Sequence, residues 1–195
     1  NDSSGYGNSG TTSSANGTGM DCMVQGKYGS ACEFDGVDDY VDLGSDKILS
    51  TGAWTLNFWF NLKDADAIYH FASSDYAGLS RYLSTLYNRL RFYNGSGVYE
   101  TSNTDFELNK WNQGVYVYDG IGTVTFYLNG RLDGSASAGY TGSATYMRSH
   151  YIGADHAAAR RYFNGSIDDV RIYNYARTAE QIQMDYNAGV GTHFR

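Results

Sequence analysis

Short runs in which hydrophobic and polar residues alternate recur along this chain, and this is the pattern of β-strands with one buried face. The clearest run extends from Trp54 to Leu62. Its apolar face carries Trp54, Leu56, Phe58, Phe60 and Leu62, and its other face carries Thr55, Asn57, Trp59 and Asn61. We therefore expect a half-buried antiparallel strand over this stretch.

Further strands are predicted at short intervals from the same alternation and from the turn residues between them. They are Ser30–Phe34, Asp39–Leu43, Ala67–Ala72, Arg81–Leu86, Arg89–Tyr93, Val98–Ser102, Trp111–Tyr118, Thr123–Leu128, Arg131–Ser135, Tyr146–Gly153 and Tyr162–Tyr173. Two-residue connections at Tyr87–Asn88 and Asn129–Gly130 predict tight hairpins, and Asn-Gly is a strong signal for such a turn.

One helix is predicted near the end of the sequence. Thr178 and Gln181 have the spacing of a capping box, in which Thr178 is the N-cap. The apolar positions that follow share one helix face, and Gly189 is expected to end the helix near Asn187.

Many strands and one short helix predict an all-β fold of two packed antiparallel sheets. The composition agrees, because 19 Tyr, 9 Phe and 24 Gly suit pleated surfaces and turns. A chain of 195 residues is long enough for one sizeable domain, so we expect a single domain over residues 1–195. Residues 1–19 are mostly Gly, Ser, Thr, Asn and Asp, and we expect a loop-like segment packed on the sandwich.

The net charge of −7 makes the domain a poor candidate for binding nucleic acid or anionic membranes. No apolar run approaches the roughly 20 residues that span a bilayer, so membrane insertion is not expected. No signal peptide is visible and the sequence starts at Asn1. We expect a mature or excised domain whose targeting segment is not shown.

Two cysteines, Cys22 and Cys32, lie ten positions apart. They are too few for a structural zinc site, which takes four ligands. A local disulfide between neighbouring strands is the favoured interpretation, and two buried free thiols are the alternative. The disulfide would favour an extracytoplasmic location.

Asp168 is the residue that is most informative about a possible chemical site. Strand alternation places it on the same face as Val170 and Ile172, where an uncompensated carboxylate would be costly. It therefore needs a cation, several N–H donors or a metal. No second carboxylate lies at the spacing that a catalytic pair would need.

Several motifs follow one another in an order that resembles a known family. They are Asp2–Asn8, Gly26–Ala31, Phe34–Val41, Trp54–Phe60, Tyr127–Gly130 and Phe163–Asn174. Together they are similar to the laminin G-like domains of the concanavalin A-like lectin/glucanase superfamily, over nearly the whole chain. The resemblance implies a jelly-roll sandwich and a secreted or cell-surface module that binds glycans or other extracellular ligands. It also implies that the domain is part of a larger multidomain protein.

The resemblance also implies a structural calcium ion held by Asp168 together with oxygens of the N-terminal segment. Asp2 and Asn8 are the best side-chain candidates there, because calcium takes oxygen ligands. The alternative is that Asp168 accepts backbone N–H groups or pairs with an arginine. Asp35, Asp38 and Asp39 surround a turn, where Asx-type hydrogen bonds are favoured over a second metal site.

Catalysis is not expected. Glucanases of this superfamily use a Glu-x-Asp-x-Glu strand, and the nearest fragment, Glu33–Asp35, has Val37 in place of the second Glu. A polysaccharide lyase would need a His, Tyr and Arg set, and His70, His150 and His156 show no spacing that identifies one.

Two segments combine aromatic, charged and amide groups of the kind that contact sugars. The candidate ligand residues are Tyr76, Arg81, Tyr82, Asp155, His156 and Arg160. The competing interpretation is that these tyrosines only cover sheet surface. The sequence thus predicts a non-catalytic, calcium-stabilised carbohydrate-binding or adhesion module. A structural or protein-interaction spacer is the first alternative, and a polysaccharide-degrading enzyme is the second.

Overall fold

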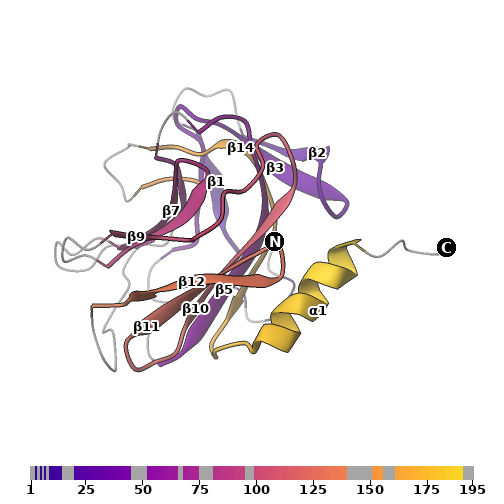
Figure 1. Cartoon of the computed structure of the whole chain (residues 1–195). Helices are drawn as coiled ribbons and strands as arrows, with labels where there is room; N and C mark the ends of the chain where they lie inside the picture. Colours follow the sequence, from indigo (N-terminus) through magenta and orange to yellow (C-terminus); the bar gives the residue numbers. More distant parts are fainter. Residues whose placement is uncertain are drawn as a thin grey trace.

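The computed structural model describes residues 3, 5, 7, 9–14, 20–44, 52–65, 68–74, 81–94, 99–139, 151–155 and 161–190. Two seven-stranded antiparallel sheets pack face to face and one helix lies outside them (Figure 1). This arrangement confirms the predicted all-β, two-sheet antiparallel jelly-roll sandwich with a short C-terminal helix.

The first sheet, called sheet A, has the strand order β1-β4-β13-β6-β7-β8-β9. Its strands are β1 (Thr11–Ser13), β4 (Tyr40–Asp42), β13 (Tyr151–Ile152), β6 (His70–Ser74), β7 (Arg81–Leu86), β8 (Arg89–Tyr93) and β9 (Tyr99–Thr101).

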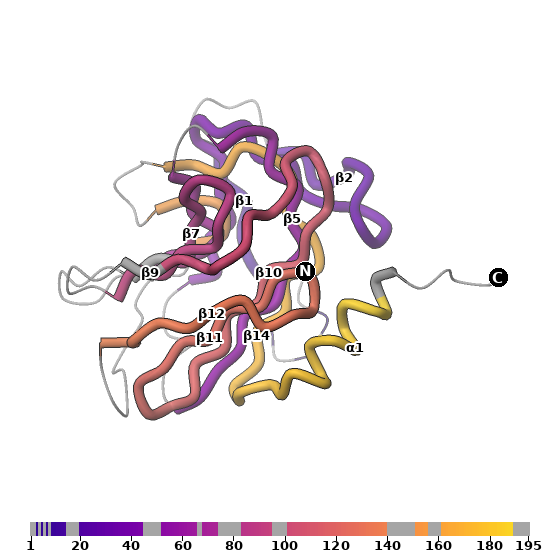
Figure 2. Tube along the Cα trace, viewed as in Figure 1, coloured from indigo at the N-terminus to yellow at the C-terminus, as the bar shows by residue number. Residues whose placement is uncertain are grey.

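The second sheet, called sheet B, has the order β12-β11-β10-β5-β14-β3-β2. Its strands are β12 (Arg131–Ser137), β11 (Thr123–Leu128), β10 (Asn112–Tyr118), β5 (Trp54–Leu62), β14 (Asn164–Tyr173), β3 (Ser30–Asp35) and β2 (Asp21–Gln25). The β2–β3 hairpin lies at the edge of this sheet (Figure 2).

The core between the sheets is rich in aromatic rings. Phe58 of sheet B contacts Phe71 of sheet A, with their ring centroids 4.6 Å apart, and Phe60 lies 4.7 Å from the same ring. All five residues predicted for the apolar face of β5 belong to this core. Tyr116 crosses it, and its hydroxyl donates to the backbone oxygen of Ser84 at 3.2 Å. Burial of these large rings is the main driving force for joining the two sheets.

The helix α1 (Ala179–Val190) covers the outer face of sheet B. Ile182 of the helix packs with Val115 and Val117 of β10, and Tyr186 stacks on Trp59 of β5 at 5.6 Å between ring centroids. Figure 1 shows the helix, in yellow, beside this sheet. Because of this cover, the supposedly outward face of β5 is buried as well, and the strand is not half-buried as predicted.

The capping box is confirmed. The Gln181 N–H donates to Thr178 Oγ1 at 3.3 Å, and the Thr178 N–H donates to Gln181 Oε1 at 3.0 Å. The predicted end near Asn187 is wrong, because the helix continues to Val190. A glycine at the end of a helix lowers its stability only by about 1 kcal/mol and does not by itself stop it.

Two edge strands escaped prediction. β1 lies inside the segment expected to be loop-like, where Thr11–Ser13 pairs with Tyr40–Asp42. β2 pairs with β3 and carries Cys22, which forms the favoured disulfide with Cys32. Both predicted hairpins are confirmed, since Leu86 pairs with Arg89 and Leu128 with Arg131.

Candidate functional site

Asp168 lies on the outer face of sheet B, and its predicted place on the core face is wrong. Ile167 pairs with Phe60 of the core, whereas Asp168 pairs with Trp59, whose ring lies under α1. A β-bulge follows, in which Asp169 and Val170 together oppose Phe58. The bulge shifts the alternation by one residue, so that Ile172 returns to the core face while Asp168 does not.

The carboxylate of Asp168 accepts two backbone hydrogen bonds. The Tyr28 N–H donates to Oδ2 at 2.8 Å, and the Asp169 N–H donates to Oδ1 at 2.6 Å. The turn between β2 and β3 approaches so closely that a Cβ on Gly26 would lie 2.6 Å from Oδ2. Asp168 therefore joins the closing strand β14 to the β2–β3 turn. This agrees with the alternative prediction that Asp168 accepts backbone N–H groups. Asp2 and Asn8, its predicted metal partners, lie outside the described residues.

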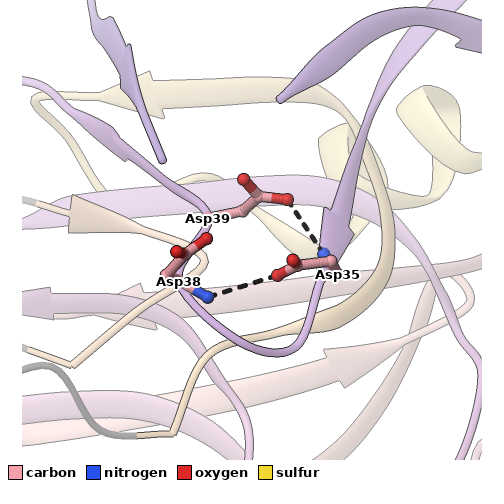
Figure 3. A group of neighbouring side chains, drawn as sticks. All are labelled: Asp35, Asp38 and Asp39. Carbon is pink, nitrogen blue, oxygen red and sulfur yellow. Dashed lines mark hydrogen bonds between the residues drawn. The ribbon is translucent and has the colours of Figure 1, made fainter. Parts of the chain in front are cut away.

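Three carboxylates converge in the turn between β3 and β4, as Figure 3 shows. One oxygen each of Asp35, Asp38 and Asp39 lies within 4.8 Å of the others. The predicted Asx-type hydrogen bonds are present, because Asp35 Oδ1 accepts the N–H groups of Val37 at 2.7 Å and Asp38 at 3.2 Å. The Asp35 N–H in turn donates to Asp39 Oδ2 at 3.0 Å.

This acidic turn concentrates negative charge in a buried place. Asp38 and Asp39 are 8% and 5% exposed, and the Oδ1 atom of Asp39 has no hydrogen-bond partner among the described residues. Burial raises the pKa of Asp39 and the neighbouring carboxylates of Asp35 and Asp38 raise it further, although the Asp35 amide and the Ser14 hydroxyl act in the opposite direction. Three hard oxygen donors in this arrangement suit a cation such as calcium.

Sheet A brings the two predicted ligand segments together. β13 pairs with β6, and β6 pairs with β7, so that Tyr151 lies opposite Ser73 and Ser73 lies opposite Tyr82. Arg81 occupies the next position, opposite Ser74. Of the other predicted ligand residues, Tyr76, His156 and Arg160 lie outside the described residues.

The pairing of β7 with β8 and of β8 with β9 extends these opposed positions into a row of tyrosines. Tyr82 pairs with Tyr93 of β8, and Tyr93 pairs with Tyr99 of β9. We call Tyr151, Tyr82, Tyr93 and Tyr99 the tyrosine row. Their chain neighbours Ile152 and Phe92 belong to the core, so Tyr151 and Tyr93 lie on the outer face of sheet A. The strand register places positions 82 and 99 in the same row.

Sequence reasoning missed Tyr93 and Tyr99, and it also missed Tyr40, whose ring packs edge-on against Tyr151 at 5.3 Å between centroids. Each of these residues lies in or beside a predicted strand. The Tyr87–Asn88 hairpin already sets Tyr93 opposite Tyr82, so Tyr93 could have been found from the sequence. Tyr40 and Tyr151 come together only because β13 pairs with β4, which is far from it in the sequence.

A polar row runs beside the tyrosines on the same face. His70 pairs with Ser84, Ser84 with Arg91, and Arg91 with Thr101. His70, Ser84 and Arg91 are buried although they face away from the core between the sheets.

Asp155, a predicted ligand residue, lies at the end of this polar row. Its Oδ1 is 3.9 Å from His70 Nδ1, and its Oδ2 is 4.0 Å from Arg161 Nη1. Burial lowers the pKa of His70 to about 3, and the positive charges of Arg161 and Arg91 contribute to this shift. His70 is therefore neutral at physiological pH, and Asp155 faces Arg161 as its charged partner.

Glu33, in the fragment nearest to a glucanase motif, forms an ion pair with Lys63 at 2.6 Å between Nζ and Oε1. Both side chains are at the surface, where such a pair contributes little to stability. Within the described part of the chain, no helix is long and apolar enough to cross a membrane.

Comparison with solved structures identifies similar folds. Domain 4 of an extracellular arabinanase from Geobacillus stearothermophilus, solved in complex with arabinotriose, is 20% identical with a TM-score of 0.70, and the alignment covers 91% of this chain and 87% of that one. A heptameric SAP-like pentraxin from Limulus polyphemus is 16% identical with a TM-score of 0.59, covering 77% and 78% of the two chains.

The binding domain of Paraclostridial Mosquitocidal Protein 1 is 15% identical with a TM-score of 0.72, and the match covers 93% of this chain and 48% of that one. The chain thus spans about half of that toxin domain. No curated protein sequence matches the chain. The family model described as the concanavalin A-like lectin/glucanases superfamily, a laminin G type, matches residues 35–183, and the chain therefore belongs to this family.

Proposed function

We propose that this domain is a non-catalytic carbohydrate-binding module that acts outside the cytoplasm, with its ligand on the outer face of sheet A. The observation that carries the proposal is the tyrosine row, in which Tyr93 and Tyr151 are only partly buried on this face. Sugar rings stack on aromatic faces, and their hydroxyl groups hydrogen-bond to a few placed polar groups.

The comparisons support the choice of ligand class. The arabinanase domain that resembles this chain over most of both lengths was solved with arabinotriose bound. At 20% identity the likeness shows only the fold, so the sugar itself is part of the proposal. The Cys22–Cys32 disulfide supports an extracytoplasmic location, where such bonds persist.

A glycan array with the wild-type domain tests this function, and arabinotriose is included among neutral and acidic oligosaccharides. We expect reproducible binding that Tyr93→Ala or Tyr151→Ala weakens at least tenfold. Tyr175→Ala is the matched control, because Tyr175 follows β14 of sheet B and is 43% exposed. A blank array would favour the alternative of a structural or protein-interaction spacer.

We also propose that calcium stabilises the domain. Asp168 with Asp2 and Asn8 remains the predicted ligand set, and a carboxylate that already accepts two N–H bonds retains lone pairs for a metal. The acidic turn is a second candidate, supported by the buried Oδ1 of Asp39 and its two neighbouring carboxylates. Calcium bound at either place would hold loops at the edges of the sheets.

Elemental analysis and thermal unfolding with calcium or EDTA test this part of the proposal. We expect one or more bound calcium ions and a melting temperature that EDTA lowers. Comparing Asp168→Asn with Asp39→Asn then assigns the effect to one locus. A melting temperature that does not respond to calcium would contradict structural calcium without affecting the proposal of sugar binding.

Polysaccharide cleavage remains the second alternative. Incubating the domain with arabinan and with β-glucans, and measuring reducing ends, tests it directly. We expect no turnover. Turnover that a single carboxylate or histidine substitution abolishes would overturn the non-catalytic proposal.

A further inference from the structure

A small pocket lies at the turn between β7 and β8, at one end of the outer face of sheet A. Leu86, Tyr87, Arg89, Thr101 and Asp105 line it. Leu86 and Arg89 form the last pair of the hairpin, two residues along from Ser84 and Arg91. They therefore share the face that carries the polar row.

Tyr87 has a backbone conformation that does not suit its side chain. Its φ is 49° and that of Asn88 is 61°, so both central residues of the turn are left-handed, as in a type I′ turn. Such positions favour Asn and Gly, and a left-handed conformation costs an ordinary side chain about 1–2 kcal/mol. The Tyr87 side chain regains little by packing, since it is 77% exposed. Strain of this kind at an exposed aromatic residue points to a binding role.

Two opposite charges line the same pocket as Tyr87. Arg89 Nε donates to Asp105 Oδ1 at 2.6 Å, and the side chains are 42% and 60% exposed. The pair has no net charge. Among the described residues, it uses one donor of the guanidinium and one oxygen of the carboxylate. The remaining N–H groups and oxygen can bond to adjacent hydroxyls of a sugar.

The backbone around the pocket is held in place. The Phe106 N–H donates to the oxygen of Asn88 at 2.7 Å, and the Ser102 N–H donates to the oxygen of Leu90 at 2.8 Å. Phe106 is buried in the core, where its ring contacts Phe60 edge-on at 4.9 Å. Asp105 is thus fixed opposite the hairpin before any ligand arrives, which lowers the entropy cost of binding.

We propose that Tyr87, Arg89 and Asp105 form a subsite for a neutral sugar ring with adjacent hydroxyl groups. The ring of Tyr87 stacks on the sugar, while the Arg89–Asp105 pair bonds to two hydroxyls. A neutral ligand is favoured because the pair has no net charge and the whole chain carries −7. This inference rests on the proposed sugar-binding function and adds a subsite that the tyrosine row does not include.

The substitution Tyr87→Asn separates binding from folding. Asn suits a left-handed turn position, so we expect the melting temperature to stay the same or to rise. Affinity for neutral oligosaccharides, measured by isothermal titration with the array hits, should fall at least tenfold. Asp105→Asn should weaken binding as well, because it breaks the ion pair. Tyr175→Asn is the matched control, with unchanged affinity.

The outcomes distinguish the subsite from the function on which it rests. If the wild-type domain binds sugars and Tyr87→Asn binds them equally well, the subsite is refuted while the proposed function stands. If the wild type binds no sugar in the panel, both are refuted. Tighter binding of polygalacturonate than of any neutral oligosaccharide would contradict the assignment to a neutral ring.

Discussion

The backbone N–H of Tyr28 donates a 2.8 Å hydrogen bond to Asp168 Oδ2, across 140 residues of sequence. The bond ties the β2–β3 turn to the last strand of sheet B. Gly26 sits against the same oxygen and leaves no room for a side chain. Asp168 is therefore a clamp between the β2–β3 turn and the last strand of sheet B. Its described partners are Tyr28 and Asp169, not the first residues of the chain.

Asp168→Asn tests this clamp. The amide keeps the shape of the carboxylate but turns an NH₂ group toward one of the two donating N–H groups. We expect the free energy of unfolding to fall by about 1–3 kcal/mol in chemical denaturation in EDTA, where no metal contributes. Asp42→Asn is the control, because the described hydrogen bond to the partly buried Asp42 carboxylate is a local one, from the Gly44 N–H. Equal stabilities of wild type and Asp168→Asn would refute the clamp.

His70 predicts a dependence of stability on pH. Its pKa is about 3 in the folded protein and about 6.5 in the unfolded chain. At a pH between these two values, His70 is protonated in the unfolded state but stays neutral in the folded state. Stability is therefore retained above about pH 6.5 and falls by up to about 1.4 kcal/mol per unit as the pH drops toward 3.

Unfolding of wild type and His70→Gln from pH 7 to pH 4 measures this contribution. The difference between the two proteins isolates His70, because the other histidines are common to both. We expect the variant to lose less stability than the wild type over this range. Parallel curves would show that His70 is not buried in its neutral form.

Asp39→Asn tests the acidic turn. The burial that raises the Asp39 pKa makes its charged form unfavourable in the folded state without a cation. Removing the charge should therefore raise the melting temperature in EDTA and reduce the increase that calcium produces. Differential scanning calorimetry measures both effects. A variant whose response to calcium equals that of the wild type would exclude the acidic turn as the site.

The Cys22–Cys32 disulfide closes a short loop across the β2–β3 hairpin. The double variant Cys22→Ser/Cys32→Ser should lower the free energy of unfolding by about 3 kcal/mol, because the loop no longer restricts the unfolded chain. Urea denaturation of both proteins measures the change. No loss of stability would show that the bridge is unimportant for this domain.

The alternation of hydrophobic and polar residues predicted the strands well where it is regular along the whole strand. The bounds of β5, β7, β8 and β11 match their predictions, and the family resemblance correctly gave the jelly roll. Alternation failed at β14, where the bulge at Asp169 and Val170 changes the face of every residue that follows. A left-handed φ of 48° at Asp169 marks this place, and nothing in the sequence indicates it.

The candidate site was predicted only in part. Arg81, Tyr82 and Asp155 belong to strands or turns of sheet A that pairing brings together. The predicted Tyr87–Asn88 hairpin already sets Tyr93 opposite Tyr82, whereas the pairing of β13 with β6, which adds Tyr151 to the row, joins strands far apart in the sequence. Tyr87 was assigned to a hairpin correctly, but its exposure and its neighbour Asp105 follow from tertiary structure alone.

Titration of isotope-labelled protein with arabinotriose and a panel of neutral oligosaccharides, followed by NMR, tests the central claim most directly. We predict saturable shifts for at least one sugar, concentrated in β6, β7, β8 and β9 and at Tyr87, with α1 and the outer face of sheet B unaffected. Absence of saturable shifts for every sugar, or shifts confined to α1 and sheet B, would contradict the proposal of a sugar-binding face on sheet A.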